Sequence, residues 1–189
     1  MLPAHRINNW TGQGMVTLRA RLRGFTAFEL LVVLGISALL AALASPSFGE
    51  LRRSAGVVSS ANQMLWALHY ARSASLVRNV PTAVCLSADG ANCLTSATAA
   101  GSGWLVFYDL ERSLPPQIAG SDELLRSVQL PPGFTVRGTR AGVTFWPASR
   151  SGTTATFTIC PDRGKPEGRA VVVSQTGRPR VNGVVSCAA

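Results

Sequence analysis

The pattern of hydrophobic and polar positions begins with a long apolar run. Residues 30–48 form a stretch of 19 residues without a charge. As a helix this stretch would be about 28 Å long, which matches one crossing of a bilayer. Arg19, Arg21 and Arg23 precede it, so the positive-inside rule predicts a cytoplasmic N-terminus and an exported C-terminal part. We therefore expect a single-pass transmembrane helix at this run.

A stem with helical periodicity follows the apolar run. Between residues 50 and 77 apolar side chains recur at a spacing close to that of a helix, at Val58, Leu65, Leu68, Ala71 and Leu76. Pro81 disfavours a helical conformation in the residue before it, so we expect the helix to end near Asn79.

The rest of the chain reads as short strands. Runs rich in β-branched and aromatic residues lie at 81–86, 104–109, 124–130, 134–137, 143–146, 154–160 and 170–174. Clusters of Gly and Pro separate them, which is typical of antiparallel hairpins. The sequence predicts an α+β fold in which a long N-terminal helix, transmembrane in its first half, packs against antiparallel β-sheets. We expect a core that includes Trp104, Phe107, Phe134, Phe145, Trp146 and Phe157.

A cleavable secretory signal is an alternative interpretation of the basic start and the apolar run. Its cleavage site would follow the run, and residues 42–47 imitate one. Glu29 argues against it, because an ionisable group at the membrane edge costs a few kcal/mol unless an opposite charge answers it. We therefore expect Glu29 to have a role.

The composition is strongly basic. The chain has 18 Lys and Arg residues against 9 Asp and Glu residues, a formal net charge of +9. From residue 51 onward there are 14 basic and 7 acidic residues, so this part alone carries a net charge of +7. A small domain this basic attracts nucleic acid or anionic lipid, although charge alone does not specify the partner.

Four cysteines, Cys85, Cys93, Cys160 and Cys187, all follow the apolar run. An even number in an exported domain favours disulfides. Three pairings are open, and we favour Cys85 with Cys93 and Cys160 with Cys187 because these pairs close the shortest loops. A zinc site is the rival interpretation, weakened because no pair has C-x-x-C spacing and the chain has only two histidines. We expect no metal and no cofactor.

The residues around Glu29 carry a resemblance to a known family. The segment Arg23-Gly24-Phe25-Thr26-Ala27-Phe28-Glu29-Leu30-Leu31 resembles the class III signal of type IV pilins and of the pseudopilins of type II secretion. The resemblance implies that a prepilin peptidase cuts after Gly24 and methylates Phe25. It also implies that Glu29 pairs with the amine of a neighbouring subunit during assembly. Whether translation starts at Met1 or Met15 is left open.

The exported part resembles the GspH/FimT group of minor pilins, most closely its FimT branch. The residues that carry this resemblance are 62–73 with Arg78 and Asn79, Trp104 with Phe107 and Asp109, and the closing segment 174–181. The implied organisation is a prepilin leader in residues 1–24, a transmembrane and assembly helix in 25–48, its exported continuation in 49–79 and a β-rich domain in 80–189. The implied location is the inner membrane, with a periplasmic domain, until assembly into a pilus.

The closing segment contains a motif that points to DNA. FimT-like proteins that bind DNA carry a C-terminal G-R-x-R motif, matched here by Gly177, Arg178 and Arg180. Two arginines separated by one residue project to the same side of an extended segment, where they can grip phosphates in a salt-sensitive contact. Further candidates for the same surface lie directly upstream: Arg163, Lys165 and Arg169.

Two functions therefore remain open. One is a minor type IV pilin that binds DNA for uptake in natural transformation, and the other is the H-type minor pseudopilin of a type II secretion system. An enzyme is disfavoured, because the cysteines are expected to be oxidised and only one histidine follows the apolar run. The expected partners are double-stranded DNA bound without sequence preference, other minor and major pilins, the prepilin peptidase and the inner membrane.

Overall fold

The computed structural model describes residues 25–147, 153–163 and 167–187, with the backbone alone for residues 43–48. The chain divides into two units, Met1–Ala44 and Ser45–Ala189. In the described part of the chain, no helix combines the length and the apolar character needed to cross a membrane. The transmembrane segment stays a prediction, and the expected leader, including Gly24, lies outside the described residues.

One helix, α1 (Ala27–Arg78), accounts for the N-terminal part of the described chain. Thr26 caps its start, because the Thr26 hydroxyl oxygen accepts a hydrogen bond from the backbone N–H of Glu29 at 3.2 Å. Directly after Arg78, Asn79 takes a left-handed conformation with φ of 56°, a common way to end a helix. The helix end predicted near Asn79 is confirmed.

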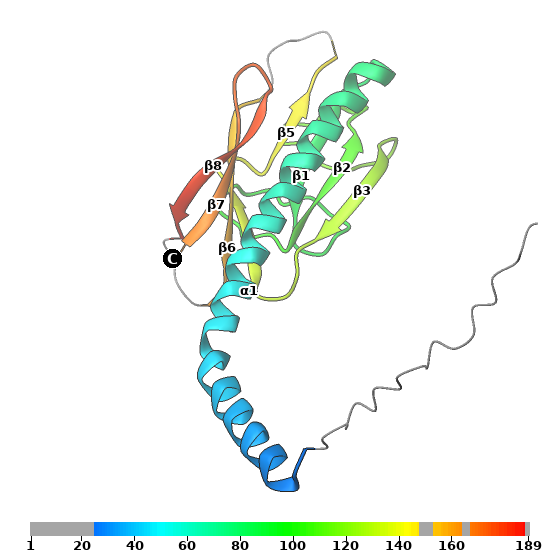
Figure 1. The fold of residues 1–189 in the computed structure, drawn as a ribbon. Helices are drawn as coiled ribbons and strands as arrows, with labels where there is room; N and C mark the ends of the chain where they lie inside the picture. Colours follow the sequence, from blue (N-terminus) through cyan, green and yellow to red (C-terminus); the bar gives the residue numbers. More distant parts are fainter. Residues whose placement is uncertain (1–24, 148–152, 164–166, 188–189) are drawn as a thin grey trace, which may run out of the picture. The chain divides into compact units, whose positions relative to one another are not determined.

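Among the described residues, eight strands follow α1 and form two antiparallel sheets (Figure 1). The first sheet has the strand order β3-β2-β1-β5, and the second has the order β4-β6-β7-β8. The strands are β1 (Thr82–Ser87), β2 (Gly103–Tyr108), β3 (Glu123–Gln129), β4 (Phe134–Gly138), β5 (Gly142–Phe145), β6 (Ala155–Pro161), β7 (Glu167–Val173) and β8 (Pro179–Ser186). The predicted α+β class and antiparallel sheets are confirmed.

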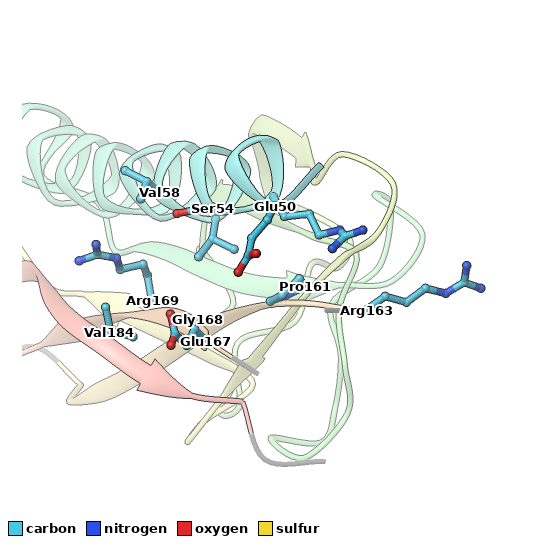
Figure 2. Close-up of a pocket in the computed structure, with 11 residues that line it drawn as sticks. Glu50, Ser54, Val58, Pro161, Arg163, Glu167, Gly168, Arg169 and Val184 are labelled. Atoms are coloured by element: carbon cyan, nitrogen blue, oxygen red, sulfur yellow. The ribbon is translucent and has the colours of Figure 1, made fainter. Parts of the chain in front are cut away.

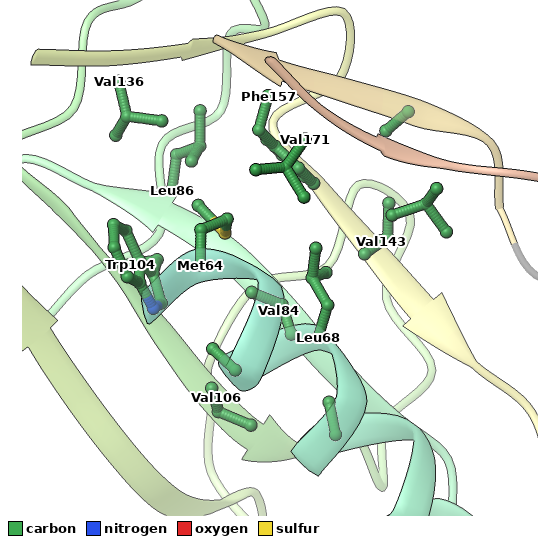
Figure 3. Packing of buried hydrophobic residues seen from close by; sticks show 14 of the residues in the cluster. Met64, Leu68, Val84, Leu86, Trp104, Val106, Val136, Val143, Phe157 and Val171 are labelled. Carbon is green, nitrogen blue, oxygen red and sulfur yellow. The ribbon is translucent and has the colours of Figure 1, made fainter. Parts of the chain in front are cut away.

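The core lies where α1 meets both sheets (Figure 3). Met64 and Leu68 of α1 are fully buried, and they pack with side chains of the first sheet, such as Trp104, and of the second, such as Phe157. A smaller cluster on the other side of the first sheet joins Cys85, Leu105 and Phe107 to Cys93 and Ile118 of the following loops. The first sheet is therefore covered on both faces at β1 and β2, whereas its edge strand β3 is mostly exposed.

Most of the expected aromatic core is confirmed, with two exceptions at its edge. Trp104, Phe107, Phe145 and Phe157 are buried, whereas Phe134 and Trp146 keep partial exposure. The Arg112 guanidinium carbon lies over the Trp146 ring, 5.9 Å from the ring centroid. Both favoured disulfides, Cys85–Cys93 and Cys160–Cys187, are present.

Candidate nucleic-acid interface

The G-R-x-R motif lies in the turn that joins β7 to β8. Gly177 adopts a φ of 68°, a left-handed conformation that glycine takes without steric cost. The N–H of Gly177 donates to the carbonyl of Ser174 at 2.8 Å, and the N–H of Ser174 donates to the carbonyl of Arg178 at 3.1 Å. The Ser174 hydroxyl accepts a further bond from the Arg178 N–H at 3.2 Å. The motif is thus part of an ordered hairpin.

A side chain of the helix holds this hairpin in place. One terminal nitrogen of the half-buried Arg72 guanidinium donates to the carbonyl of Gly177 at 2.9 Å, across 105 positions of the sequence. A hydrogen bond from a charged donor is stronger than one between neutral groups. The bond therefore fixes the turn that presents the motif against the end of α1.

Strand register decides which way the two arginines point. Val173 pairs with Pro179 and faces the core, so Arg180, which pairs with Val172, faces the opposite way. We call the side of the second sheet turned away from α1 the outer face; its strand residues are Thr135, Arg137, Thr156, Thr158, Cys160, Gly168, Ala170, Val172 and Arg180. Arg178 and Arg180 are both exposed while Gly177 and Pro179 are buried. Arg178 comes directly before β8, and its carbonyl accepts a bond from the Ser174 N–H, so the antiparallel pairing continues to Arg178 and places it on the same side as Arg180.

Of the upstream candidates, Arg169 does not join them. Arg169 pairs with the buried Ile159, so it lies on the face toward α1. Both Arg163 and Arg169 line a pocket together with Glu50 of α1, and Figure 2 shows their side chains at opposite sides of it. The expectation that these two share a surface with Arg178 and Arg180 is therefore wrong for Arg169, because strand register reverses its direction. Lys165 lies outside the described residues.

Two features of the stem escape sequence reasoning. Arg72 belongs to the segment that resembles the GspH/FimT group, but the sequence alone suggested no role for it. Only folding brings the carbonyl of Gly177 within hydrogen-bond distance of its guanidinium. Trp66 and Tyr70 stack at 5.2 Å between ring centroids, and the Arg126 guanidinium lies 4.5 Å from the Trp66 centroid. The i, i+4 spacing of the two aromatics is a signal for this stack.

Among the described residues, the candidate processing and assembly residues near the N-terminus are Phe25 and Glu29. Phe25, the expected first residue after processing, is exposed. Glu29 occupies the third position of α1, where a carboxylate favours the positive end of the helix dipole. With Thr26 it forms the T-x-x-E pattern of a capping box, of which the hydroxyl half is made. Glu29 therefore has a local role in starting the helix, beside the assembly role implied by resemblance.

Comparison with solved structures gives two similar proteins. The type IV minor pilin FimU of Pseudomonas aeruginosa shares 18% identity; the match covers 70% of this chain and 95% of that chain, with a TM-score of 0.48. The minor pseudopilin EpsH from the type 2 secretion system of Vibrio cholerae shares 12% identity over 67% of this chain and 95% of that chain, with a TM-score of 0.47. No curated protein matches the chain.

A protein family matches the larger part of the chain. The family, described as type II transport protein GspH, matches residues 60–177. The match contains strands β1 to β7 and ends at Gly177, so Arg178 and Arg180 follow it. It confirms the coarser expectation of a minor pilin or pseudopilin of a type IV pilus or a type II secretion system. The chain belongs to the GspH family.

Proposed function

We propose that this protein is a minor type IV pilin of the FimT branch that holds DNA through Arg178 and Arg180 and so supports DNA uptake in natural transformation. The observation that carries the proposal is the hairpin itself. Two exposed arginines point the same way from a turn that Arg72 anchors to the helix.

The chemistry of this hairpin suits a phosphate backbone. Residues two apart on a strand lie about 7 Å apart, so the two guanidinium groups can contact separate phosphates. No carboxylate occurs in residues 171–181, so none within the hairpin competes for the arginines. Contacts of this kind release counterions, are independent of sequence and weaken steeply with salt.

The test is duplex binding by the full chain in a nonionic detergent, measured by fluorescence anisotropy over a salt series. We expect Arg178→Ala/Arg180→Ala to lower the slope of log K against log salt by about 0.9 for each phosphate that is no longer neutralised. Arg52→Ala/Arg53→Ala removes the same charge from exposed positions of α1 and serves as the control. Failure of the wild type to bind at low salt would end the proposal.

The proposal includes processing and assembly. The leader 1–24 is removed after Gly24 by a prepilin peptidase, Phe25 is methylated, and residues 25–48 anchor the chain in the inner membrane before it joins other pilins through Glu29. The uncharged run and the basic residues before it support this. N-terminal sequencing and mass measurement of the cell-derived protein test the cleavage and the methyl group. We also propose that the chain has no catalytic activity.

A pseudopilin of type II secretion is the second candidate, favoured by the description of the matched family. In that role the domain contacts protein partners and the arginine pair is not needed for DNA. The two functions separate in a deletion strain complemented with Arg178→Ala/Arg180→Ala. Loss of transformation with intact secretion supports the pilin, and the reverse supports the pseudopilin.

A further inference from the structure

The outer face of the second sheet carries little bulk and is partly open: Ala170 is buried on it, and the Cys160–Cys187 disulfide lies beside Gly168. Along β6, Ala155, Phe157 and Ile159 are buried toward α1, while the alternate residues Thr156 and Thr158 are partly exposed. Ala170 and Val172 of β7 lie beside these threonines on the same face. Part of the face is a shallow hollow bordered by Thr139, Thr154 and Ser174. Small hydroxyl-bearing side chains leave room for a flat, polar partner to approach.

Arginines stand at both edges of this face. β4 and β8 are the two edge strands of the second sheet. The register sets Arg137 of β4 opposite Thr158 and Arg180 of β8 opposite Val172, so both lie on the outer face. Three strand spacings separate β4 from β8, which is about 14 Å. Arg140 lies near the β4 edge, and its Nε donates to the carbonyl of Thr154 at 3.1 Å.

The charge of the face has one sign. None of the strand residues that make up the outer face is acidic. Glu167 of β7 is two positions before Arg169 and therefore lies on the face toward α1. A partner on the outer face thus meets cations at two edges and hydroxyl groups between them.

We propose that Arg137 is a further phosphate contact, and that a DNA duplex lies across the outer face with Arg137 on one of its strands and Arg178 and Arg180 on the other. This inference rests on the proposed function. Arg137 is level with Thr158 and Arg180 with Thr156, two residues or about 7 Å along the strands, so the two backbones are about 16 Å apart. Long arginine side chains can adjust this span to the major-groove width of B-DNA, about 12 Å, so the two edges can face phosphates of different strands. The threonine hydroxyls between the edges donate to phosphate oxygens, as is common in DNA-binding surfaces.

The experiment compares a 30-base-pair duplex with the matching single strand, using the full chain in nonionic detergent. We expect Arg137→Ala to lower the salt slope for the duplex by about 0.9. A single strand bound along the β8 edge does not reach Arg137, so its slope should not change. The control is Arg52→Ala, an exposed arginine of α1, which should change neither slope. Arg137→Glu should weaken duplex binding further than Arg137→Ala.

The possible results distinguish failure of this inference from failure of the proposed function. If Arg178→Ala/Arg180→Ala loses duplex binding and Arg137→Ala behaves like Arg52→Ala, the inference fails and the proposed function stands. An equal loss for duplex and single strand with Arg137→Ala contradicts the arrangement across two strands. If the wild type binds neither probe, the proposed function fails and this inference fails with it.

Discussion

The two sheets of this domain are both built from antiparallel strands, but they differ in how far the rest of the chain covers their faces. In the first sheet every residue of β1 and β2 is buried, because α1 covers one face and the loops holding Cys93 and Ile118 cover the other. In the second sheet β6 alternates between buried and partly exposed residues, so the face toward α1 is covered and the other face is partly open. The second sheet therefore has a face available for a partner.

The difference in burial between the two sheets follows from the side chains of their strands. β1 and β2 read as nearly continuous hydrophobic runs, TAVCLS and GWLVFY, as expected for strands buried on both faces. β6 reads ATFTICP, in which threonine takes every outward position before Cys160. Strands enclosed on both sides, such as β1 and β2, contribute stability, whereas the second sheet, with arginines at its edges, also presents a surface.

The largest expected effect tests whether the second sheet has one buried face. Phe157→Ala should destabilise the protein by about 3–5 kcal/mol, because it removes a fully buried ring from the shared core. Its neighbour Thr158, on the outer face, should cost no more than about 0.5 kcal/mol when changed to Ala. Urea unfolding followed by tryptophan fluorescence measures both. A loss with Thr158→Ala as large as that with Phe157→Ala would mean that the outer face is covered.

In the first sheet the same experiment should give the opposite pattern. Leu86 packs in the core shared with α1, and Leu105 packs in the cluster on the other face. Both are fully buried, so Leu86→Ala and Leu105→Ala should each cost about 2–5 kcal/mol. A negligible loss at Leu105 would remove the contrast between the two sheets.

The two disulfides, one beside each sheet, allow a further comparison of stability between the sheets. Loop closure alone assigns about 2.6 kcal/mol to Cys85–Cys93 and about 3.6 kcal/mol to Cys160–Cys187, whose sequence separations are 8 and 27. Cys85 and Cys93 are also buried in the layer over the first sheet, whereas Cys160 and Cys187 keep partial exposure. We therefore expect Cys85→Ala/Cys93→Ala to lose at least as much stability as Cys160→Ala/Cys187→Ala. An order that follows loop length alone would contradict this.

Much of the fold was predictable because its signals are local. Runs rich in β-branched and aromatic residues predicted both β2 and β6. The strand β8 was expected only as an extended segment, because Asn182 and Gly183 interrupt its apolar pattern. β7 begins at Glu167, earlier than predicted, because pairing with β8 extends it through Gly168 and Arg169, which carry no hydrophobic signal.

The candidate site was predictable only in part. The spacing of Arg178 and Arg180 sufficed to place both on one side of the chain. The direction of Arg169 and the presence of Arg137 on the outer face depend on register between strands far apart in the sequence. The bond from Arg72 to Gly177 depends on how α1 packs against the β7–β8 hairpin. No single segment of the sequence holds that information.

A smaller effect is expected for the hydrogen bond that joins Arg72 to the β7–β8 hairpin of the second sheet. Arg72→Ala should cost about 1–2 kcal/mol and loosen the hairpin, because the carbonyl of Gly177 loses a charged donor. Hydrogen exchange should rise at the amides of Gly177 and Arg178, while the amides of β1 and β2 stay protected. Arg52→Ala, at an exposed position of the same helix, is the control. Unchanged exchange in the hairpin would show that Arg72 does not position the motif.

The smallest expected effect lies in the loop that covers the first sheet. The side-chain amide of Asn92 donates to the Asp89 carboxylate at 2.7 Å, and the N–H groups of Asn92 and Ala91 donate to it as well. Led by the Asn92 side chain, these bonds hold the pKa of Asp89 well below its usual 3.8. The unfolded carboxyl then takes up a proton first as pH falls, so the stability from this charge is complete well above pH 3.8 and is lost below it. Asp89→Asn should therefore lower the Tm at pH 7, and the two Tm values should converge in acid. A Tm difference that stays constant with pH would show that the charge of Asp89 does not stabilise this loop.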